Sequence, residues 1–206
     1  MTDVYAELAH LGSATVHEAG ERAPVVDVAL IQILPASRAA GPALTVRCGQ
    51  DDNLMVHAAV AEAEPGEVLV LTMPEPSPVA LVGELLATQA KARGVAAFLV
   101  DAAVRDVEEL REVGLPVWAR YVRVSGAGKS VPGAIGEPVR VGGATIRQGD
   151  VVVLDADGAV VVEHERIADV LAAARARAER ERVKRTKLEA GELSYDLDGL
   201  RELVER

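Results

Sequence analysis

The sequence of 206 residues contains little cysteine, few aromatic residues and no excess of basic charge. Cys48 is the single cysteine, which excludes an internal disulfide and a multi-thiolate metal site and is typical of a reducing compartment. Aromatic residues make up 2% of the chain, so few rings can stack on bases, and the net charge of -10 disfavours binding to phosphates. We therefore expect no nucleic-acid partner.

Long apolar runs and a basic leader are also lacking. No stretch approaches the roughly 18 uninterrupted apolar residues that a membrane-spanning helix needs. The first ten residues carry Asp3 and Glu7 where a secretory signal would be basic. We expect no membrane partner and a cytoplasmic location. The length, and a hydrophobic share of 50%, predict that residues 1–206 form a single domain.

Short β-branched runs, bounded by Gly, Pro or Asp, alternate with helical patterns. Strands are predicted at 43–47, 67–72, 95–100, 116–121, 151–155 and 159–163. Helices are predicted at 2–12, 13–22, 54–64 and 79–94. Ser13 can serve as the N-cap of the second helix. This alternation is typical of the α/β fold class.

The second half of the chain has a different pattern. From 116 to 163 only turns separate the predicted strands, and Asp157-Gly158 indicates a hairpin. We therefore expect a mixed α/β sandwich in which an α/β half passes into a β-rich half. From about residue 165 the pattern predicts one long helix whose apolar stripe fades after Leu171, so that 165–206 form a C-terminal helical extension.

Some patterns that suggest familiar chemistry do not meet its requirements. SGAGKS at 125–130 looks like the end of a phosphate-binding loop. Such a loop needs glycine five residues before Gly128, where this sequence has Arg123, and no helix is predicted after the motif. The histidines, His57 among them, do not have the spacing of zinc ligands. The lysines, Lys129 among them, lie on polar helix faces or in glycine loops, which disfavours imine chemistry.

The stretch DAAVRD ends a predicted buried strand with Arg105 and Asp106 side by side. Ligands often bind beyond the carboxyl ends of such strands. Asp106 can cap the following helix together with Glu109, and Arg105 can form an exposed ion pair. Alternatively, the aspartate binds a hard cation such as Mg²⁺ and the guanidinium binds the carboxylate of a 2-oxo acid. The residues alone leave both interpretations open.

VGELLATQA could supply the other half of such a site. Gly83 would let a ligand approach the backbone, and a helix that begins there would present free amides. Ser77-Pro78 can also begin the helix, in which case Gly83 lies inside it.

These segments together resemble a known family, the metal-dependent class II pyruvate aldolases that cleave 4-hydroxy-4-methyl-2-oxoglutarate and 4-carboxy-4-hydroxy-2-oxoadipate. The regulators of ribonuclease activity A share this family. The resemblance covers nearly the whole chain, in SATVHEAG, DDNLMVHAAVAEAEPGEVLVL, GELL, VRD, PVWAR, VGGATIRQGDVVVLDADGAVVV and KLEAGELSYDLDGL. The GELL and VRD pair, about twenty residues apart, is fairly specific to the family.

The resemblance implies a swivelling α-β-β-α sandwich, assembled as a homotrimer or homohexamer with sites between subunits. It also implies that a helix begins at Gly83 and that its amides, through Leu85 and Leu86, bind the pyruvyl group. In the same way, Arg105 is expected to bind substrate and Asp106 to hold Mg²⁺ or Mn²⁺, largely through water.

Further acidic residues receive roles by the same resemblance. Glu84 matches an acidic residue of the family that orients or activates a water of the metal site. The C-terminal helix of a neighbouring subunit is expected to lend Glu181, with Glu179 as a second candidate and Glu18 as a weaker one.

The implied activity is retro-aldol cleavage of a 4-hydroxy-2-oxo diacid to pyruvate and a second oxo acid, with oxaloacetate decarboxylation as a side activity. Alternatives are a non-catalytic regulator that binds a ribonuclease-type protein, and an oxo-acid lyase with another natural substrate. Two features depart from the family: Ala102 stands where glycine is usual, and the loop VRVSGAGKSVPGAIGE differs. The second leaves recognition of the far end of the substrate open.

Overall fold

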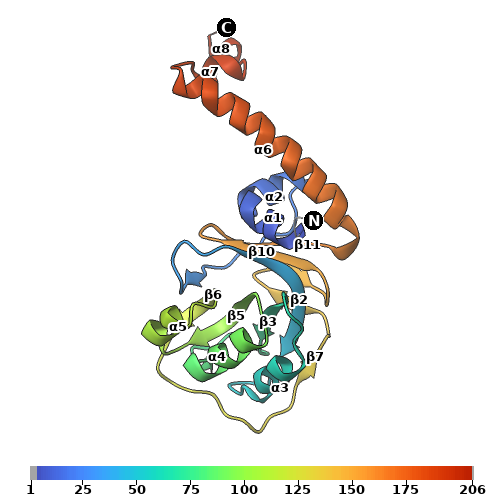
Figure 1. Ribbon diagram of the computed structural model, residues 1–206, viewed down its shortest axis with the longest axis vertical. Coiled ribbons are helices and arrows are strands. Elements are labelled where there is room, and N and C mark those ends of the chain that lie inside the picture. Colours follow the sequence, from blue (N-terminus) through green and yellow to red (C-terminus); the bar gives the residue numbers. More distant parts are fainter. Residues whose placement is uncertain (1–3, 206) are drawn as a thin grey trace.

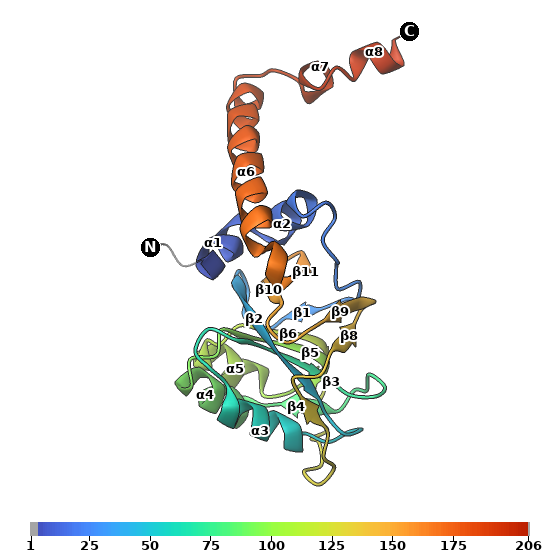
Figure 2. The ribbon, with the colours of Figure 1, turned by 90° about the vertical axis from the view of Figure 1, so that its right-hand side faces the viewer.

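The computed structural model describes residues 4–205. In that part of the chain a curled, nine-stranded mixed sheet lies between two groups of helices (Figure 1, Figure 2). The strands are β1 (Ile31–Gln32), β2 (Ala39–Arg47), β3 (Val68–Thr72), β4 (Ala80–Val82), β5 (Ala97–Val104), β6 (Val117–Val122), β7 (Ala134–Ile135), β10 (Val151–Asp155) and β11 (Gly158–Val162), with β8 (Val139–Val141) and β9 (Ala144–Ile146) in a separate ribbon. The helices are α1 (Val4–Leu11), α2 (Ser13–Ala19), α3 (Leu54–Glu62), α4 (Glu84–Ala92), α5 (Val107–Val113), α6 (Ile167–Glu189), α7 (Ser194–Leu197) and α8 (Arg201–Val204), with a 3-10 turn at His164–Arg166.

The sheet runs in the order β1-β6-β5-β3-β2-β10-β11, with β4 beside β5 and β7 beside β2. Strands β2, β3, β5 and β6 pair in parallel and alternate with α3, α4 and α5 along the chain. Strand β2 joins this part to the antiparallel hairpin β10–β11, because Ala43 pairs with Val68 of β3 while Pro42 pairs with Val151 of β10. An α/β half thus passes into a β-rich half, as the sequence predicts.

The segment before β1 brings the two edges of the sheet together. The backbone N–H of Val26 donates to the carbonyl of Ala159 in β11 (3.0 Å). A few residues later Ile31 pairs with Ala119 of β6. Inside the curl, the indole N–H of Trp118 donates to the carbonyl of Asp155 (2.8 Å), which satisfies the one polar group of this buried ring. The two halves of the sheet therefore face each other.

Three buried apolar clusters correspond to the layers of the fold. One lies between the sheet and α3, α4 and α5, and includes Leu86 and Leu110. The second fills the curl around Trp118. The third lies under α1, α2 and the start of α6, and includes Leu8 and Leu171. The order is helix, sheet, sheet, helix, so the expected α-β-β-α sandwich is confirmed.

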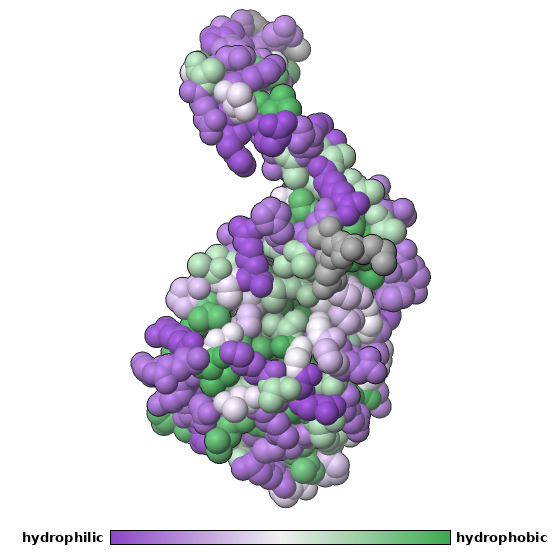
Figure 3. All heavy atoms as spheres, in the orientation of Figure 1, coloured by the Kyte–Doolittle hydropathy of each residue, from purple (hydrophilic) through white to green (hydrophobic). Residues whose placement is uncertain are grey.

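The C-terminal arm, defined here as α6, α7 and α8, projects away from this body (Figure 1, Figure 2). Val170, Leu171 and Ala174 are the buried residues of α6. Ile167 packs against the third cluster and Arg175 pairs with Glu7 of α1, whereas the later half of α6 extends beyond the body (Figure 1). Polar side chains cover most of the arm, with apolar ones among them (Figure 3). The predicted long helix whose apolar stripe fades is confirmed. Within residues 4–205, no helix combines the length and apolar content needed to cross a membrane.

Two local predictions are wrong. The segment 79–94 is not one helix, because residues Ala80–Val82 form the buried strand β4 before α4 begins. Ser13 is not an N-cap: it lies inside α2, where its N–H and hydroxyl both donate to the carboxylate of Asp155 (2.7 and 2.6 Å). The cap of α2 therefore comes from the β10–β11 hairpin, which is distant in sequence. That hairpin follows the Asp157-Gly158 signal as predicted.

Candidate active site

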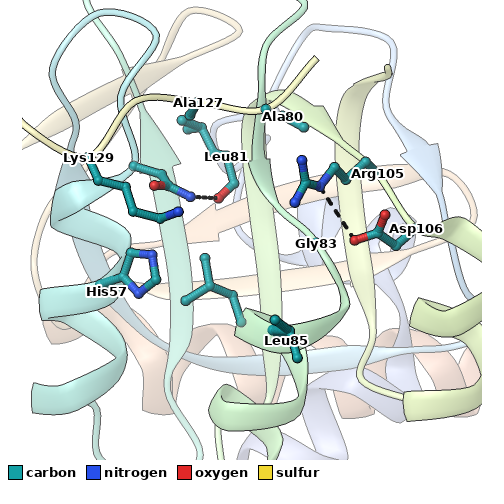
Figure 4. A pocket seen from close by; sticks show the side chains of 12 residues that line it. His57, Ala80, Leu81, Gly83, Leu85, Arg105, Asp106, Ala127 and Lys129 are labelled. Carbon is teal, nitrogen blue, oxygen red and sulfur yellow. Dashed lines mark hydrogen bonds and ion pairs between the residues drawn. The ribbon is translucent and has the colours of Figure 1, made fainter. Parts of the chain in front are cut away.

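A pocket opens where β4 and β5 end, between α3, the start of α4 and the loop 124–130 (Figure 4). Strands β4 and β5 are parallel neighbours, and Val82 pairs with Val104. The next residue of each strand, Gly83 and Arg105, therefore leaves the sheet at the same edge. This pairing is the physical reason why GELL and VRD, well separated in sequence, belong to one site.

The helix α4 begins at Glu84 with Gly83 as its N-cap, so its first-turn amides face the pocket edge. The alternative start at Ser77-Pro78 is wrong. Gly83 has no side chain that could cap the helix. Instead, the backbone N–H of Glu84 donates to Oδ2 of Asp106 (3.1 Å). Asp106 thus lies at the N-terminus of α4, where a negative charge is favourable.

Asp106 has an unusual backbone conformation for a non-glycine residue. Its φ of 61° and ψ of 48° lie in the left-handed region, which costs of order 1–2 kcal/mol. It occupies the N-cap position of α5, yet its carboxylate makes no capping hydrogen bond there. The interpretation of Asp106 as the cap of its own helix is therefore wrong. Its carboxylate is turned toward Gly83 and the guanidinium of Arg105, whose Nε lies 3.5 Å away.

Two glycines leave room for this arginine and aspartate pair. A Cβ added to Gly83 would lie 2.4 Å from Oδ2 of Asp106, and one added to Gly126 would lie 2.6 Å from Nη1 of Arg105. Neither glycine needs a left-handed backbone, so these glycines are explained by close approach to the site.

The residues around the start of α4 point in different directions. Leu86 is buried, whereas Leu85 is 82% exposed at the rim of the pocket. The carboxylate of Glu84 accepts a hydrogen bond from the hydroxyl of Thr88 (2.8 Å), one turn along the helix. The backbone of Glu84 therefore contributes to the site, while its side chain lies outside the pocket lining.

Asn53, His57 and Lys129 also line the pocket, although sequence reasoning assigned them no role. Asn53 is 8% exposed; its amide donates to the carbonyl of Leu81 (3.0 Å), but its Oδ1 has no partner. The buried Nε2 of His57 also lacks one. An unpaired buried polar group costs about 1–3 kcal/mol, which a ligand or water would offset. The available signal was the spacing of Asn53 and His57, which places both on one face of α3.

The acidic candidates of the C-terminal helix lie elsewhere. Glu181 pairs with Arg177 (2.8 Å) and Glu179 with Arg182 (2.7 Å). Both sit on α6, at the opposite end of the molecule from α3 and α4, and Glu18 lies on α2 beside α6 (Figure 1). One chain thus brings Gly83, Leu85, Leu86, Arg105 and Asp106 together and leaves these three glutamates apart.

Asp106 is the residue of the pocket that could hold a divalent metal. Within residues 4–205 no group of three or more His, Cys, Asp or Glu side chains could do so. Mg²⁺, however, is commonly bound by one or two carboxylates and several waters. Oδ1 of Asp106, which has no hydrogen bond in the described chain, is a hard donor of the required kind. The donor set therefore fits a largely hydrated Mg²⁺ or Mn²⁺.

Comparison with known proteins gives consistent results. A family model described as RraA-like, Aldolase/RraA, matches residues 8–161. A curated relative from Halalkalibacterium halodurans, named "Putative 4-hydroxy-4-methyl-2-oxoglutarate aldolase", is 38% identical over 122 residues, which are 59% of this chain and 58% of the relative. The match therefore spans less than two thirds of that relative.

Two solved structures share the architecture. A protein of Pseudomonas syringae pv. tomato str. DC3000 superposes with a TM-score of 0.82 at 24% identity, over 92% of this chain and 90% of that one, which shows the fold. A Streptomyces coelicolor protein, described as an unusual member of the RNase ES inhibitor RraA protein family, superposes with a TM-score of 0.78 at 29% identity, over 90% and 96% of the two chains.

Proposed function

The chain belongs to the RraA-like family of aldolases and RraA proteins, and from this membership we propose that it is a metal-dependent class II pyruvate aldolase. Its reaction would be the cleavage of a 4-hydroxy-2-oxo diacid into pyruvate and a second oxo acid. The observation that supports this most is the convergence of three groups on one pocket edge: the first-turn amides of α4, the guanidinium of Arg105 and the carboxylate of Asp106.

Arg105 and the first turn of α4 are suited to bind the carboxylate of a 2-oxo acid. The guanidinium offers two parallel N–H donors, and the amides at a helix N-terminus favour an anion. The two together would hold the pyruvyl end at this edge, and the rest of the substrate would occupy the pocket. A Mg²⁺ or Mn²⁺ ion held by Asp106 through water would supply positive charge next to the 2-oxo group.

Cleavage requires a base that takes the proton of the C4 hydroxyl. The C3–C4 bond then breaks, C4 becomes a carbonyl, and the electron pair passes to C3 as the enolate of pyruvate, which a water protonates. We assign the delivery of this water to Glu84, whose carboxylate would turn from Thr88 toward the pocket. Glu181 of a second copy is the proposed acidic residue that completes the site. Loss of carbon dioxide from oxaloacetate gives the same enolate, so this side activity is part of the proposal.

The proposal includes a homotrimer or homohexamer, because α6, which carries Glu181, lies at the opposite end of the molecule from α3 and α4 of the same chain (Figure 1). It also includes a cytoplasmic setting, for which the support is that the sequence has a single cysteine and therefore no internal disulfide. Burial raises the pKa of the Cys48 thiol to about 12, so the thiol stays protonated at neutral pH.

A regulator that binds a ribonuclease-type protein is the second candidate. The similarity to a member of the RNase ES inhibitor family and the net charge of -10 favour it. Such a role would need neither metal nor the arginine and aspartate pair.

Pyruvate release from a panel of 4-hydroxy-2-oxo diacids separates these candidates. We expect release with Mg²⁺ or Mn²⁺, loss of release in excess chelator and recovery when metal is returned. Arg105→Ala protein, purified in parallel, controls for contaminating activity. Full activity in excess chelator would remove the metal from the proposal. No release from any diacid, with either metal, would favour the regulator.

A further inference from the structure

The pocket has two chemically distinct ends. Arg105 and Asp106 lie on one side, while Lys129 extends over His57 on the other (Figure 4). Apolar side chains, among them Leu81 and Leu85, lie between the two ends. The first end is used in the proposed function, whereas the second has no role in it.

The second end contains polar groups without partners. Oδ1 of the buried Asn53 and Nε2 of His57 have no hydrogen bond. The ammonium of Lys129 makes no ion pair or hydrogen bond with any residue of the described chain, although the chain carries an excess of acidic residues. A cation, an unpaired acceptor and a ring nitrogen therefore meet at one end of a pocket.

The backbone around Lys129 is fixed by its neighbours. The carboxylate of Asp52, which is 2% exposed, accepts the N–H groups of Ser130 (2.7 Å) and Leu54 (2.9 Å). These hydrogen bonds outweigh the effect of burial, which alone would raise the pKa of Asp52, and hold it below its ordinary value. On the other side of Lys129, the carbonyl of Gly128 accepts the N–H of Asn53 (2.9 Å).

The glycines of SGAGKS follow from this arrangement. A Cβ on Gly128 would lie 2.8 Å from Oδ2 of Asp52, and Gly126 passes close to Arg105. The carbonyl of Ser125 accepts the N–H of Ala80 (2.8 Å), which ties the loop to β4. The motif is thus a clamped strap across the pocket that carries one lysine, rather than a phosphate-binding loop.

We infer that Lys129, with Asn53 and His57, forms a second carboxylate site that selects 2-oxo diacids over 2-oxo monoacids. The inference rests on the proposed function, which places the first carboxylate on Arg105. Cations at both ends of the pocket match a substrate with a carboxylate at both ends. Oδ1 of Asn53 can accept the hydroxyl hydrogen of C4, and a protonated Nε2 of His57 can donate to the second carboxylate.

Two ligands that cannot be cleaved isolate the second carboxylate. 2-Oxoglutarate and 2-oxopentanoate have the same chain length and the same 2-oxo acid end, and differ in the group at C5. Their dissociation constants are measured by calorimetry with Mg²⁺ present. We expect wild type to bind 2-oxoglutarate ~10- to 150-fold more tightly, as for a charge-assisted contact.

Lys129→Met should remove this preference and leave the affinity for 2-oxopentanoate unchanged, whereas Lys129→Arg should keep part of it. Lys129 is exposed, so neither change should affect folding, which a thermal melt checks. Lys187→Met, which removes an exposed and unpaired lysine of α6, is the matched control and should retain the full preference.

The outcomes distinguish failure of the second carboxylate site from failure of the proposed aldolase function. If wild type releases pyruvate but binds both ligands equally, or if Lys129→Met keeps the preference, the second carboxylate site is wrong and the aldolase proposal stands. If wild type releases no pyruvate from any diacid and binds neither ligand, both are wrong.

Discussion

Around the pocket, some polar side-chain atoms on fixed backbone have no partner in the described chain, namely Oδ1 of Asn53, Nε2 of His57 and the ammonium of Lys129, whereas along the C-terminal arm many charged side chains pair with one another. Arg177 pairs with Glu181, Arg182 with Glu179, Lys184 with Asp198, and Arg201 with Asp196. The arm also exposes apolar side chains, at Val183, Leu188, Leu193, Leu200, Leu203 and Val204. The unsatisfied groups of the pocket suit a small charged ligand, and those of the arm suit a protein surface.

The backbone shows the same contrast. The pocket residues Asp106 and Gly83 are held by nonlocal contacts, namely the hydrogen bond from Glu84 and the pairing of β4 with β5. The ion pairs of the arm join exposed residues within the arm, and such surface pairs contribute at most about 1 kcal/mol each. The pocket therefore depends on the sheet, whereas the arm is held to the body through the start of α6.

The strongest test of the pocket end is Asp106→Asn. The amide oxygen can still accept the N–H of Glu84, so we expect the melting temperature to change little. An amide is a poorer ligand for a hard cation. Mutation of the residues that hydrogen-bond to a metal ligand already lowers metal affinity or activity ~10- to 100-fold. Loss of the ligand itself should therefore lower the rate of pyruvate release by more than ~100-fold.

Glu109→Gln is the matched control for Asp106→Asn, since Glu109 is exposed on the first turn of α5. It should retain both stability and activity. Near wild-type turnover of Asp106→Asn would leave the aspartate with a structural role alone.

Arg105→Lys comes next in expected effect. The charge is kept, but the two parallel N–H donors are lost. A contact of this kind contributes roughly 1.5–3 kcal/mol, which corresponds to a ~10- to 150-fold fall in kcat/KM for pyruvate release. An unchanged kcat/KM would show that the guanidinium does not bind the substrate. The pair of Arg105 and Asp106 would then be a surface ion pair like those of the arm.

Mixing two inactive variants tests whether the C-terminal arm of one copy reaches the pocket of another. Glu181→Ala and Arg105→Ala subunits should each be nearly inactive alone. If Glu181 completes the pocket of a second copy, hybrid assemblies contain some sites with both residues, and part of the pyruvate release should return. No recovery after proven subunit exchange would separate the arm from the chemistry.

The smallest expected effect concerns Asp52, which holds the strap. Its pKa is lowered in the folded protein, so its contribution to stability is present at neutral pH and is lost as the pH falls below about 4, through its folded-state pKa. Asp52→Asn should lower the melting temperature at pH 7, and its melting temperature should fall less than that of wild type between pH 7 and pH 3. Asp51→Asn, at the exposed neighbour, should follow the wild-type profile.

Much of the fold could be predicted from local pattern. β-branched runs bounded by breakers mark β2, β3, β5, β6, β10 and β11, because these strands are buried and their ends are punctuated by Gly, Pro or Asp. β4 could not be recognised, since a three-residue apolar run next to a helical pattern reads as helix. Its state is fixed by pairing with β5. β8 and β9 were also missed, because they are strands of only three residues on either side of Gly142-Gly143.

The site divides in the same way. Arg105, Asp106 and Gly83 could be found because strand exits and a glycine before a helix are visible in the sequence. Lys129 could not, because the sequence does not show that the strap 125–130 is bonded to Ala80 and Asn53. The spacing of Asn53 and His57 was visible, but not that their unpaired atoms lie at a pocket. The rejection of SGAGKS as a phosphate loop was sound, but it left open where the loop lies.

The junction of β2 with β10, and of Val26 with Ala159, also orders events during synthesis on the ribosome. The parallel strands β2, β3, β5 and β6 and the helices α3, α4 and α5 find their partners within residues 43–122, so this block can assemble as it emerges. Helix α2 emerges earlier but packs on α6, β11 and β10, which are made later, whereas α1 also contacts β2. Contacts between residues so far apart slow folding. The nascent chain should therefore acquire the scaffold of its pocket before α2 has a surface to pack on, and ribosome-bound chains stalled after β6 should protect that scaffold, but not α2, from protease.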